Sequence, residues 1–340
     1  MSLKKALLNS LKFAAFLILG LVLLYLAFRN VSIVELRSHL GNANYRWLAL
    51  SVAASVAAFA SRARRWQIII GTLGFTPPLK NVYHALMSGY LANMALPRMG
   101  EVTRCALLGR KEKIPFDRLV GTVILERVVD VASLLIIMGI MLVTSFDTLG
   151  SFLRDNIILA LSEKTASVLG STLTARIVTV TLAFTLLLMT FIFRKRIFGK
   201  RLYPRVRGFI SGMYQGFRSI RSLERKWEFI IHSVFIWFAY AVMTWAVVFV
   251  LPATSHLGFG DALFLLVIGG FGMAAPVQSG LGAFHVIISM GLNLVYGISR
   301  TDGLAYALVS HTSQMILIAL LGSVSMLLIM RHRNNNSVKP

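Results

Sequence analysis

Apolar segments of about the length of a membrane span recur along this chain, and short charged segments separate them. They lack the alternating polarity of outer-membrane strands, which are about ten residues long. The pattern therefore predicts an all-α polytopic membrane protein. The spanning candidates are 13–28, 47–61, 118–146, 176–193, 227–251 and 302–330.

The composition agrees with this class. Of the 340 residues, 56% are hydrophobic and 14% are charged, whereas soluble domains have about 45–50% and about 25%. The single cysteine, Cys105, excludes an internal disulfide and a cysteine-rich metal site. The seven histidines show no ligand spacing, so we expect no metal and no cofactor.

The net charge of +22 has two interpretations. Basic chains are typical of nucleic-acid binding, but membrane proteins also concentrate Lys and Arg in cytoplasmic loops. If the helices cross in turn from a cytoplasmic N-terminus, 27 of the 35 Lys and Arg residues fall on cytoplasmic segments. Orientation then explains the charge, and we expect no nucleic-acid partner. The expected location is the bacterial inner membrane, with an uncleaved N-terminal anchor, both termini cytoplasmic and a short basic tail at 331–340.

Three shorter apolar segments, 82–96, 262–275 and 283–296, fall below the about 20 residues that a span needs. The positive-inside rule puts both ends of the first segment inside. The other two segments, taken as one unit, begin and end outside. Each region is therefore a re-entrant dip or a pair of short crossing helices. The result is six to eight spans in a single transmembrane domain over 1–330.

This order predicts an inverted-topology repeat. The first repeat, 47–146, has a span, a dip from the inside and a span, and the second, 227–330, has the same order from the outside. The dips share a short pattern, MALP at 94–97 and MAAP at 273–276. Paired interrupted segments of this kind are typical of transporter binding sites.

Residues 203–226 differ from the spans. Apolar residues recur there at helical spacing among several arginines. The pattern favours an amphipathic helix on the cytoplasmic face, attracted to anionic headgroups. An ordinary solvated basic loop is the alternative.

Charges gather just after the first dip. Arg98 and Arg104 offer planar guanidinium donors suited to phosphate or carboxylate, and Glu101 can pair with either arginine. Pro97 ends or kinks the preceding helix, and Gly100 permits tight backbone. We expect a substrate site at this tip. The alternative is a set of ordinary cytoplasmic loop charges.

A second charged group lies two turns into the next span. Glu126 and Asp130 are at i and i+4 on one helix face, and Arg127 lies one step round. Ionisable residues inside a membrane usually face a polar interior, a partner or a path. These residues bind a ligand, or they form a structural ion-pair cluster with Arg98 or Arg104. Both roles can hold together.

The second dip carries a flexible polar turn. Ser279, Gly280 and Gly282 open the helix that starts near 283, where free backbone N–H groups attract anions. His285 in its first turn can bond a phosphate or titrate. We expect substrate contacts from Gln278, Ser279 and His285, and gating by Pro97, Gly100, Pro276, Gly280 and Gly282. The alternative is a glycine turn with a locally bonded histidine.

At these residues the chain resembles the flippase-like membrane family that includes the transmembrane region of lysylphosphatidylglycerol synthase. The resemblance covers nearly the whole chain. It is carried by Pro97-Arg98-x-Gly100-Glu101-x-x-Arg104, Glu126-Arg127-x-x-Asp130 and a looser Pro276-x-x-x-Gly280-x-Gly282 stretch. It implies a polytopic inner-membrane protein that moves or binds a lipid with a polar headgroup. The chain has Gln278-Ser279-Gly280 and His285 where the family often has Pro-Gly-Gly and Glu.

We expect a lipid flippase or lipid-binding transporter and no enzyme, because no catalytic motif is visible. The family's soluble aminoacyl-transferring domain has no counterpart here, so synthesis of an aminoacyl lipid is not expected. The expected partners are anionic or aminoacylated phospholipid, or polyprenyl phosphate. Two alternatives stay open, an integral-membrane transferase acting on a lipid-linked substrate and a non-catalytic partner of a lipid or envelope enzyme.

Overall fold

The computed structural model describes residues 18, 20–25, 27–28, 32–96, 99–144 and 223–331. Three predicted features lie mostly or wholly outside this part of the chain: the span 176–193, the amphipathic helix 203–226 and the basic tail. Pro97 and Arg98 lie outside it too.

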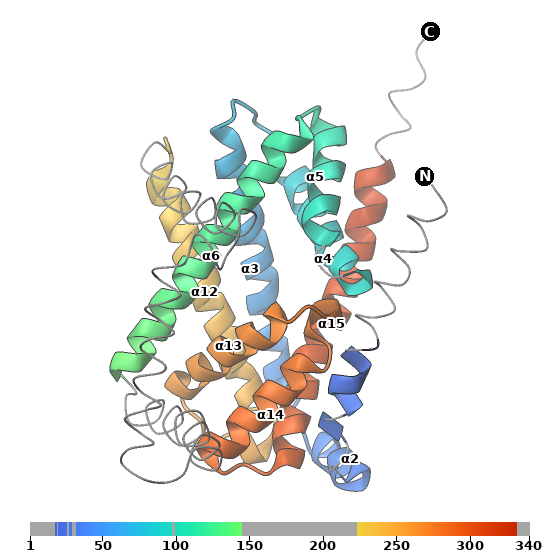
Figure 1. Ribbon diagram of the computed structural model, residues 1–340, viewed down its shortest axis with the longest axis vertical. Helices are drawn as coiled ribbons and strands as arrows, with labels where there is room; N and C mark the ends of the chain where they lie inside the picture. Colours follow the sequence, from blue (N-terminus) through green and yellow to red (C-terminus); the bar gives the residue numbers. More distant parts are fainter. Residues whose placement is uncertain are drawn as a thin grey trace, which may run out of the picture. The chain divides into compact units, whose positions relative to one another are not determined.

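The described elements are all helical, as the sequence predicts (Figure 1). The first group is α2 (Ile33–Gly41), α3 (Arg46–Gly71), α4 (Leu79–Ala95), α5 (Met99–Glu112) and α6 (Phe116–Thr144). The second group is α12 (Lys226–Val248), η2 (Pro252–Thr254), α13 (Phe259–Ala274), η3 (Gln278–Gly280), α14 (Ala283–Tyr296) and α15 (Arg300–Arg331).

Three segments of the described chain are long and apolar enough to cross a membrane. They are Lys226–Val248, Gln278–Tyr296 and Arg300–Met330. The first and third correspond to the predicted spans 227–251 and 302–330. The second joins η3 to α14, so the short segment 283–296 reaches span length once the turn before it is included.

The predicted end of the span 47–61 is wrong. Helix α3 continues through Arg62 and Arg65 to Gly71, and Trp66, Ile69 and Ile70 beyond the arginines are buried. The helix does not stop at its first arginine because both guanidinium groups find carboxylate partners inside the protein. An arginine in an apolar pattern therefore did not mark a loop here.

Both dips are helical hairpins. Helices α4 and α5 pack together where Gly89 and Gly100 face one another, and a Cβ on Gly100 would lie 2.3 Å from the Gly89 carbonyl oxygen. Only glycine allows this approach. Helices α4 and α13 end at Ala95 and Ala274, the second residues of the MALP and MAAP patterns. The inverted relation between the two halves itself stays a prediction.

The two hairpins meet through α4. Figure 1 shows α4 and α5 in the upper half of the described bundle, with α13 and α14 in the lower half. Helix α4 contacts η3, the turn at the tip of the second hairpin, and also packs along α15. Among the described elements, α3 and α12 pack extensively against one another, and α4 of the first hairpin contacts α3 while α13 of the second contacts α12.

Candidate functional site

A cluster of ion pairs lies buried between three helices. Helix α3 supplies Arg62 and Arg65 one turn apart, α5 supplies Arg104, and α6 supplies Glu126 and Asp130 one turn apart. Because i, i+3 and i, i+4 residues share a helix face, each pair points the same way. The Arg65 and Glu126 side chains are fully buried.

The carboxylates are shared among the arginines. One nitrogen of Arg62, Nη2, lies 2.8 Å from both Glu126 Oε1 and Asp130 Oδ2. Arg65 Nη2 lies 2.5 Å from Asp130 Oδ1, and Arg104 Nη1 lies 2.8 Å from Glu126 Oε2. Arg62 also donates to the Tyr240 hydroxyl of α12 at 2.9 Å. Four helices are therefore tied to one polar centre.

Positive charge exceeds negative charge in this cluster. Among the described residues, Arg62, Arg65 and Arg104 pair with two carboxylates, those of Glu126 and Asp130. Several guanidinium N–H groups have no hydrogen-bond partner among the described residues, namely Nε of all three arginines, Nη1 of Arg65, and Nη1 and Nη2 of Arg104. Buried charges without full compensation are costly, and an anion would satisfy both the charge and the donors.

Arg104 is held in place by its surroundings. Its guanidinium carbon lies 4.6 Å from the centroid of the Trp66 ring, which is within cation–π range. Trp66 is itself fixed, because its Nε1 donates to Thr122 Oγ1 at 2.9 Å. Arg104 Nη1 lies close to Glu126 Oε2, but the two atoms are not aligned for a hydrogen bond. The position of Arg104 is set, while its donors stay open.

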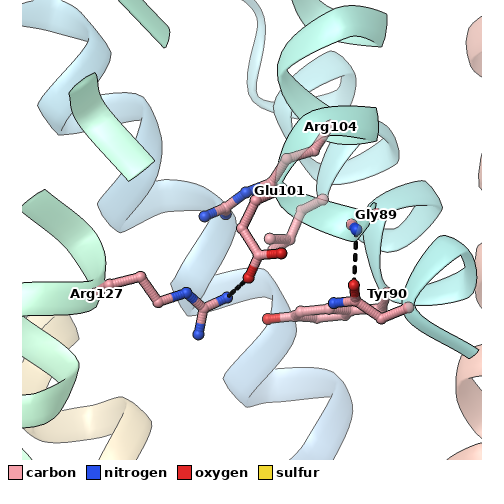
Figure 2. Close-up of a pocket in the computed structure, with 8 residues that line it drawn as sticks. Gly89, Tyr90, Glu101, Arg104 and Arg127 are labelled. Carbon is pink, nitrogen blue, oxygen red and sulfur yellow. Dashed lines mark hydrogen bonds and ion pairs between the residues drawn. The ribbon is translucent and has the colours of Figure 1, made fainter. Parts of the chain in front are cut away.

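Arg104 and Arg127 both line a crevice whose walls come from α4, α5 and α6 (Figure 2). The space between its lining atoms is about 160 Å³, part of which is open solvent, and it has no room for a water molecule. At its outer edge Arg127 and Glu101 point toward one another and pair at 2.9 Å, with 44% and 31% of their side chains exposed. The lining residues are Leu86, Gly89, Tyr90, Asn93, Gly100, Glu101, Arg104 and Arg127. The crevice is thus closed by a solvent-accessible ion pair.

Open polar groups of both signs line this crevice. The Tyr90 hydroxyl, Glu101 Oε2 and Arg127 Nε have no hydrogen-bond partner among the described residues. Asn93 Oδ1 accepts from the Gly100 N–H at 2.6 Å, which fixes the α4–α5 crossing. Guanidinium groups suit phosphate, and a carboxylate suits an ammonium group. Both groups occur in polar lipid headgroups.

The turn of the second hairpin forms a separate polar group. Gln278 and His285 are buried, and Ser279 and Gly280 take positive φ angles of 46° and 75°. The Ser279 carbonyl accepts from Nε2 of His311 on α15 at 2.8 Å. Pro276 lies between the end of α13 and η3, as a helix-ending proline should.

The predicted site residues are partly brought together. Arg104 pairs with Glu126, one of the pairings that the sequence left open, and Glu101 pairs with Arg127; Arg98 lies outside the described residues. Gly282 lies at the other hairpin, with a φ of 77° at the start of α14. The ligand roles of all these residues stay predictions.

Arg62 and Arg65 were not among the predicted site residues. The predicted span 47–61 ends just before them, at the first charge after the apolar run. The apolar residues after them, from Trp66 to Ile70, continue the same helix and are the signal that was overlooked. Tyr90, Asn93 and Tyr240 carried no such signal, because a lone polar residue in an apolar helix has many roles.

These features define a polytopic α-helical membrane protein with an arginine-rich buried site between its helices. The sequence pattern of the family described as lysylphosphatidylglycerol synthase TM region matches residues 12–322, so the chain belongs to that family. A UPF0104 membrane protein of Methanocaldococcus jannaschii is 30% identical over 112 residues, 31% of this chain. The match spans about a third of that relative's length (33%).

Proposed function

We propose that the protein binds the phosphate-bearing headgroup of a membrane lipid at the arginine cluster and moves that lipid across the inner membrane. One observation carries the proposal. Three buried arginines share two carboxylates and keep N–H groups without a partner among the described residues, and one of them, Arg104, lines a crevice. Membership of a family named for a lipid synthase's membrane region supports a lipid-related role.

Each group has a distinct part in this proposal. Arg104 offers its free donors to a phosphate, while Glu126 and Asp130 hold Arg62 and Arg65 behind it. The Glu101–Arg127 pair must part before a headgroup enters, because the crevice is closed. Glu101 then meets any amino group of the headgroup. No bond is made or broken, so the role is transport and not catalysis.

The second hairpin acts as the opposing gate in this proposal. Its turn η3 contacts α4, and α4 carries Tyr90 and Asn93 of the crevice. A movement of the turn is therefore transmitted to the crevice wall. Alternating access across a fixed site between two repeats needs a connection of this kind. In the proposed orientation both chain termini are cytoplasmic.

The test is transbilayer movement of headgroup-labelled phospholipid in vesicles containing the protein. Arg104→Lys keeps the charge but loses the planar donor edge, and we expect movement about tenfold slower, which is about 1.4 kcal/mol. Arg110→Lys is the control, because Arg110 is exposed in the last turn of the same helix. Equal rates in wild type and Arg104→Lys, at equal thermal stability, would remove Arg104 from the mechanism. A new lipid product would favour the transferase alternative.

A further inference from the structure

Two buried histidines face one another at the tip of the second hairpin. His285 lies in the first turn of α14 and His311 lies on α15, with 2% and 7% of each residue exposed. Their ring centroids are 4.9 Å apart at an interplanar angle of 67°. Phe284 covers the His311 ring at 5.4 Å, so the pair is enclosed. The arginine cluster does not include these two rings.

The hydrogen bonds fix where a proton can be added. A carbonyl oxygen only accepts, so His311 Nε2 must carry the hydrogen that it gives to Ser279. The neutral His311 ring therefore keeps its lone pair on Nδ1. His285 Nδ1 has no partner among the described residues, and neither has either amide atom of the buried Gln278. The tip therefore has buried hydrogen-bonding atoms that lack a partner among the described residues.

A positive charge on either ring has no counter-charge nearby in the described part of the chain. Tyr306, five residues or about 7.5 Å before His311 on α15, is a neutral phenol that donates its hydroxyl hydrogen to the Thr244 carbonyl. The other ionisable groups on the packed elements lie at distant ends. Arg300 and Asp302 are nine or more residues before His311, about 14 Å along α15, and Asp261 is in the first turn of α13. Tyr296 is at the other end of α14, Tyr90 is the titratable residue of α4 nearest its end at η3, and Tyr25 of the N-terminal segment is exposed. Each ring faces chiefly the other.

Protonation of His311 on Nδ1 leaves its hydrogen bond to the Ser279 carbonyl in place, so the opening has to come from the cost of burying the charge. The N-terminus of α14 carries partial positive charge, which opposes a cation on His285. A buried imidazolium without a partner is costly, so a protonated pair gains by exposure to water or to an anion. The tip contacts α4 through η3, and its Gly282 lies against the N-terminal segment at Gly20. Opening the tip would release both contacts.

We propose that His285 and His311 together bind one proton and that this proton opens the turn between α13 and α14. Lipid movement then depends on protons, a consequence that rests on the proposed function. The opening itself does not, since it is a property of the hairpin alone. The two parts can be tested apart.

The opening is tested by thiol labelling of Leu281→Cys in the full chain, in detergent, at pH 5 and pH 8, the range over which histidine titrates. Leu281 is half-buried beside the tip, and native Cys105 is fully buried, so protein without the new cysteine is the blank. Because only the thiolate reacts, each rate is divided by the rate of free glutathione with the same reagent at the same pH. We expect this ratio to be at least about fivefold higher at pH 5, a typical coupling between two linked equilibria.

Added substitutions assign this effect. His285→Gln with His311→Gln keeps neutral donors and acceptors and should remove the pH difference. His256→Gln, at an exposed loop histidine, should keep it. An equal difference in the glutamine variant, or none in the parent, would overturn the proposal. If the double variant does not fold, either single variant must reduce the difference. In vesicles, movement that is equal at both pH values while labelling differs would separate the gate from the lipid role.

Discussion

The two hairpins of this protein are held by different kinds of interaction. The α4–α5 hairpin is fixed to its neighbours by charge, through Arg104 on Glu126 and Glu101 on Arg127. The α13–α14 hairpin is closed by neutral groups, through Ser279 to His311 and close backbone contacts at Gly282. The two helical hairpins are thus held by different interactions, ion pairs in the first and neutral contacts in the second.

This difference suits the two hairpins to different roles, ligand binding for the first and conformational change for the second. A fixed array of buried charges suits a ligand of opposite charge, because its donors are already in place. A hairpin held by neutral hydrogen bonds and tight backbone suits a change of conformation, because a small change in protonation or shape alters its fit. We therefore expect variants of the first hairpin to affect binding and ion-pair stability, and variants of the second to affect packing and closure.

The largest effect is expected from Glu126→Gln. This change leaves Arg62 and Arg65 sharing Asp130 and leaves Arg104 without a carboxylate among the described residues, and breaking a buried pair costs about 3–5 kcal/mol. The free energy of unfolding in detergent should fall by that amount or the protein should not fold. Glu228→Gln is the matched control, because Glu228 pairs with Arg64 at a partly exposed position and should cost at most about 1 kcal/mol. Similar losses in the two variants would mean that the cluster is not the electrostatic centre.

Gly282→Ala tests the backbone fit of the second hairpin. Gly282 has a φ of 77°, and its Cβ would lie 2.5 Å from the Gly20 oxygen and the Leu24 nitrogen. Strain at such a position costs about 1–3 kcal/mol, which a thermal melt in detergent would show as a lower midpoint. Gly260→Ala, in α13 with open space around it, should instead stabilise by about 0.5–1 kcal/mol. A neutral result at Gly282 would refute the tight closure.

The smallest effect is expected from Trp66→Phe. Phenylalanine keeps an aromatic face under Arg104 but loses the hydrogen bond to Thr122, worth about 1 kcal/mol. Chemical denaturation should resolve this loss. Trp227→Phe should change nothing measurable, because Trp227 is 69% exposed. If the free energy of unfolding falls by much more than one hydrogen bond is worth, Trp66 stabilises the site by more than its bond to Thr122.

Much of the fold could be predicted from hydrophobic pattern alone. The segments 82–96, 262–275, 283–296 and 302–330 agree within a few residues with α4, α13, α14 and α15. Apolar length and helix-ending prolines determine these elements locally. The end of α3 differs because the prediction stops at the first arginine, although apolar residues from Trp66 to Ile70 continue the pattern. The carboxylates of α6 that pair with these arginines are remote in sequence, so the pattern alone does not show that the arginines are buried.

The site could be predicted only in part for the same reason. Spacing places Glu126 and Asp130 on one face, but which arginine meets them depends on how α3, α5 and α6 pack. The pairing of His285 with His311 brings together residues from different helices, and neither local sequence contains the other. Long-range contacts of this kind follow from the tertiary structure, not from periodicity.

The most direct test of the headgroup site is native mass spectrometry of the lipid that stays bound to the purified protein. Wild type and Arg110→Ala should retain a phosphate-bearing lipid, whereas Arg104→Ala, which removes the open donors at the crevice, should lose most of it. Thermal melts of the same samples would show that the variants are folded. Equal retention of the same lipid by folded Arg104→Ala would contradict the account.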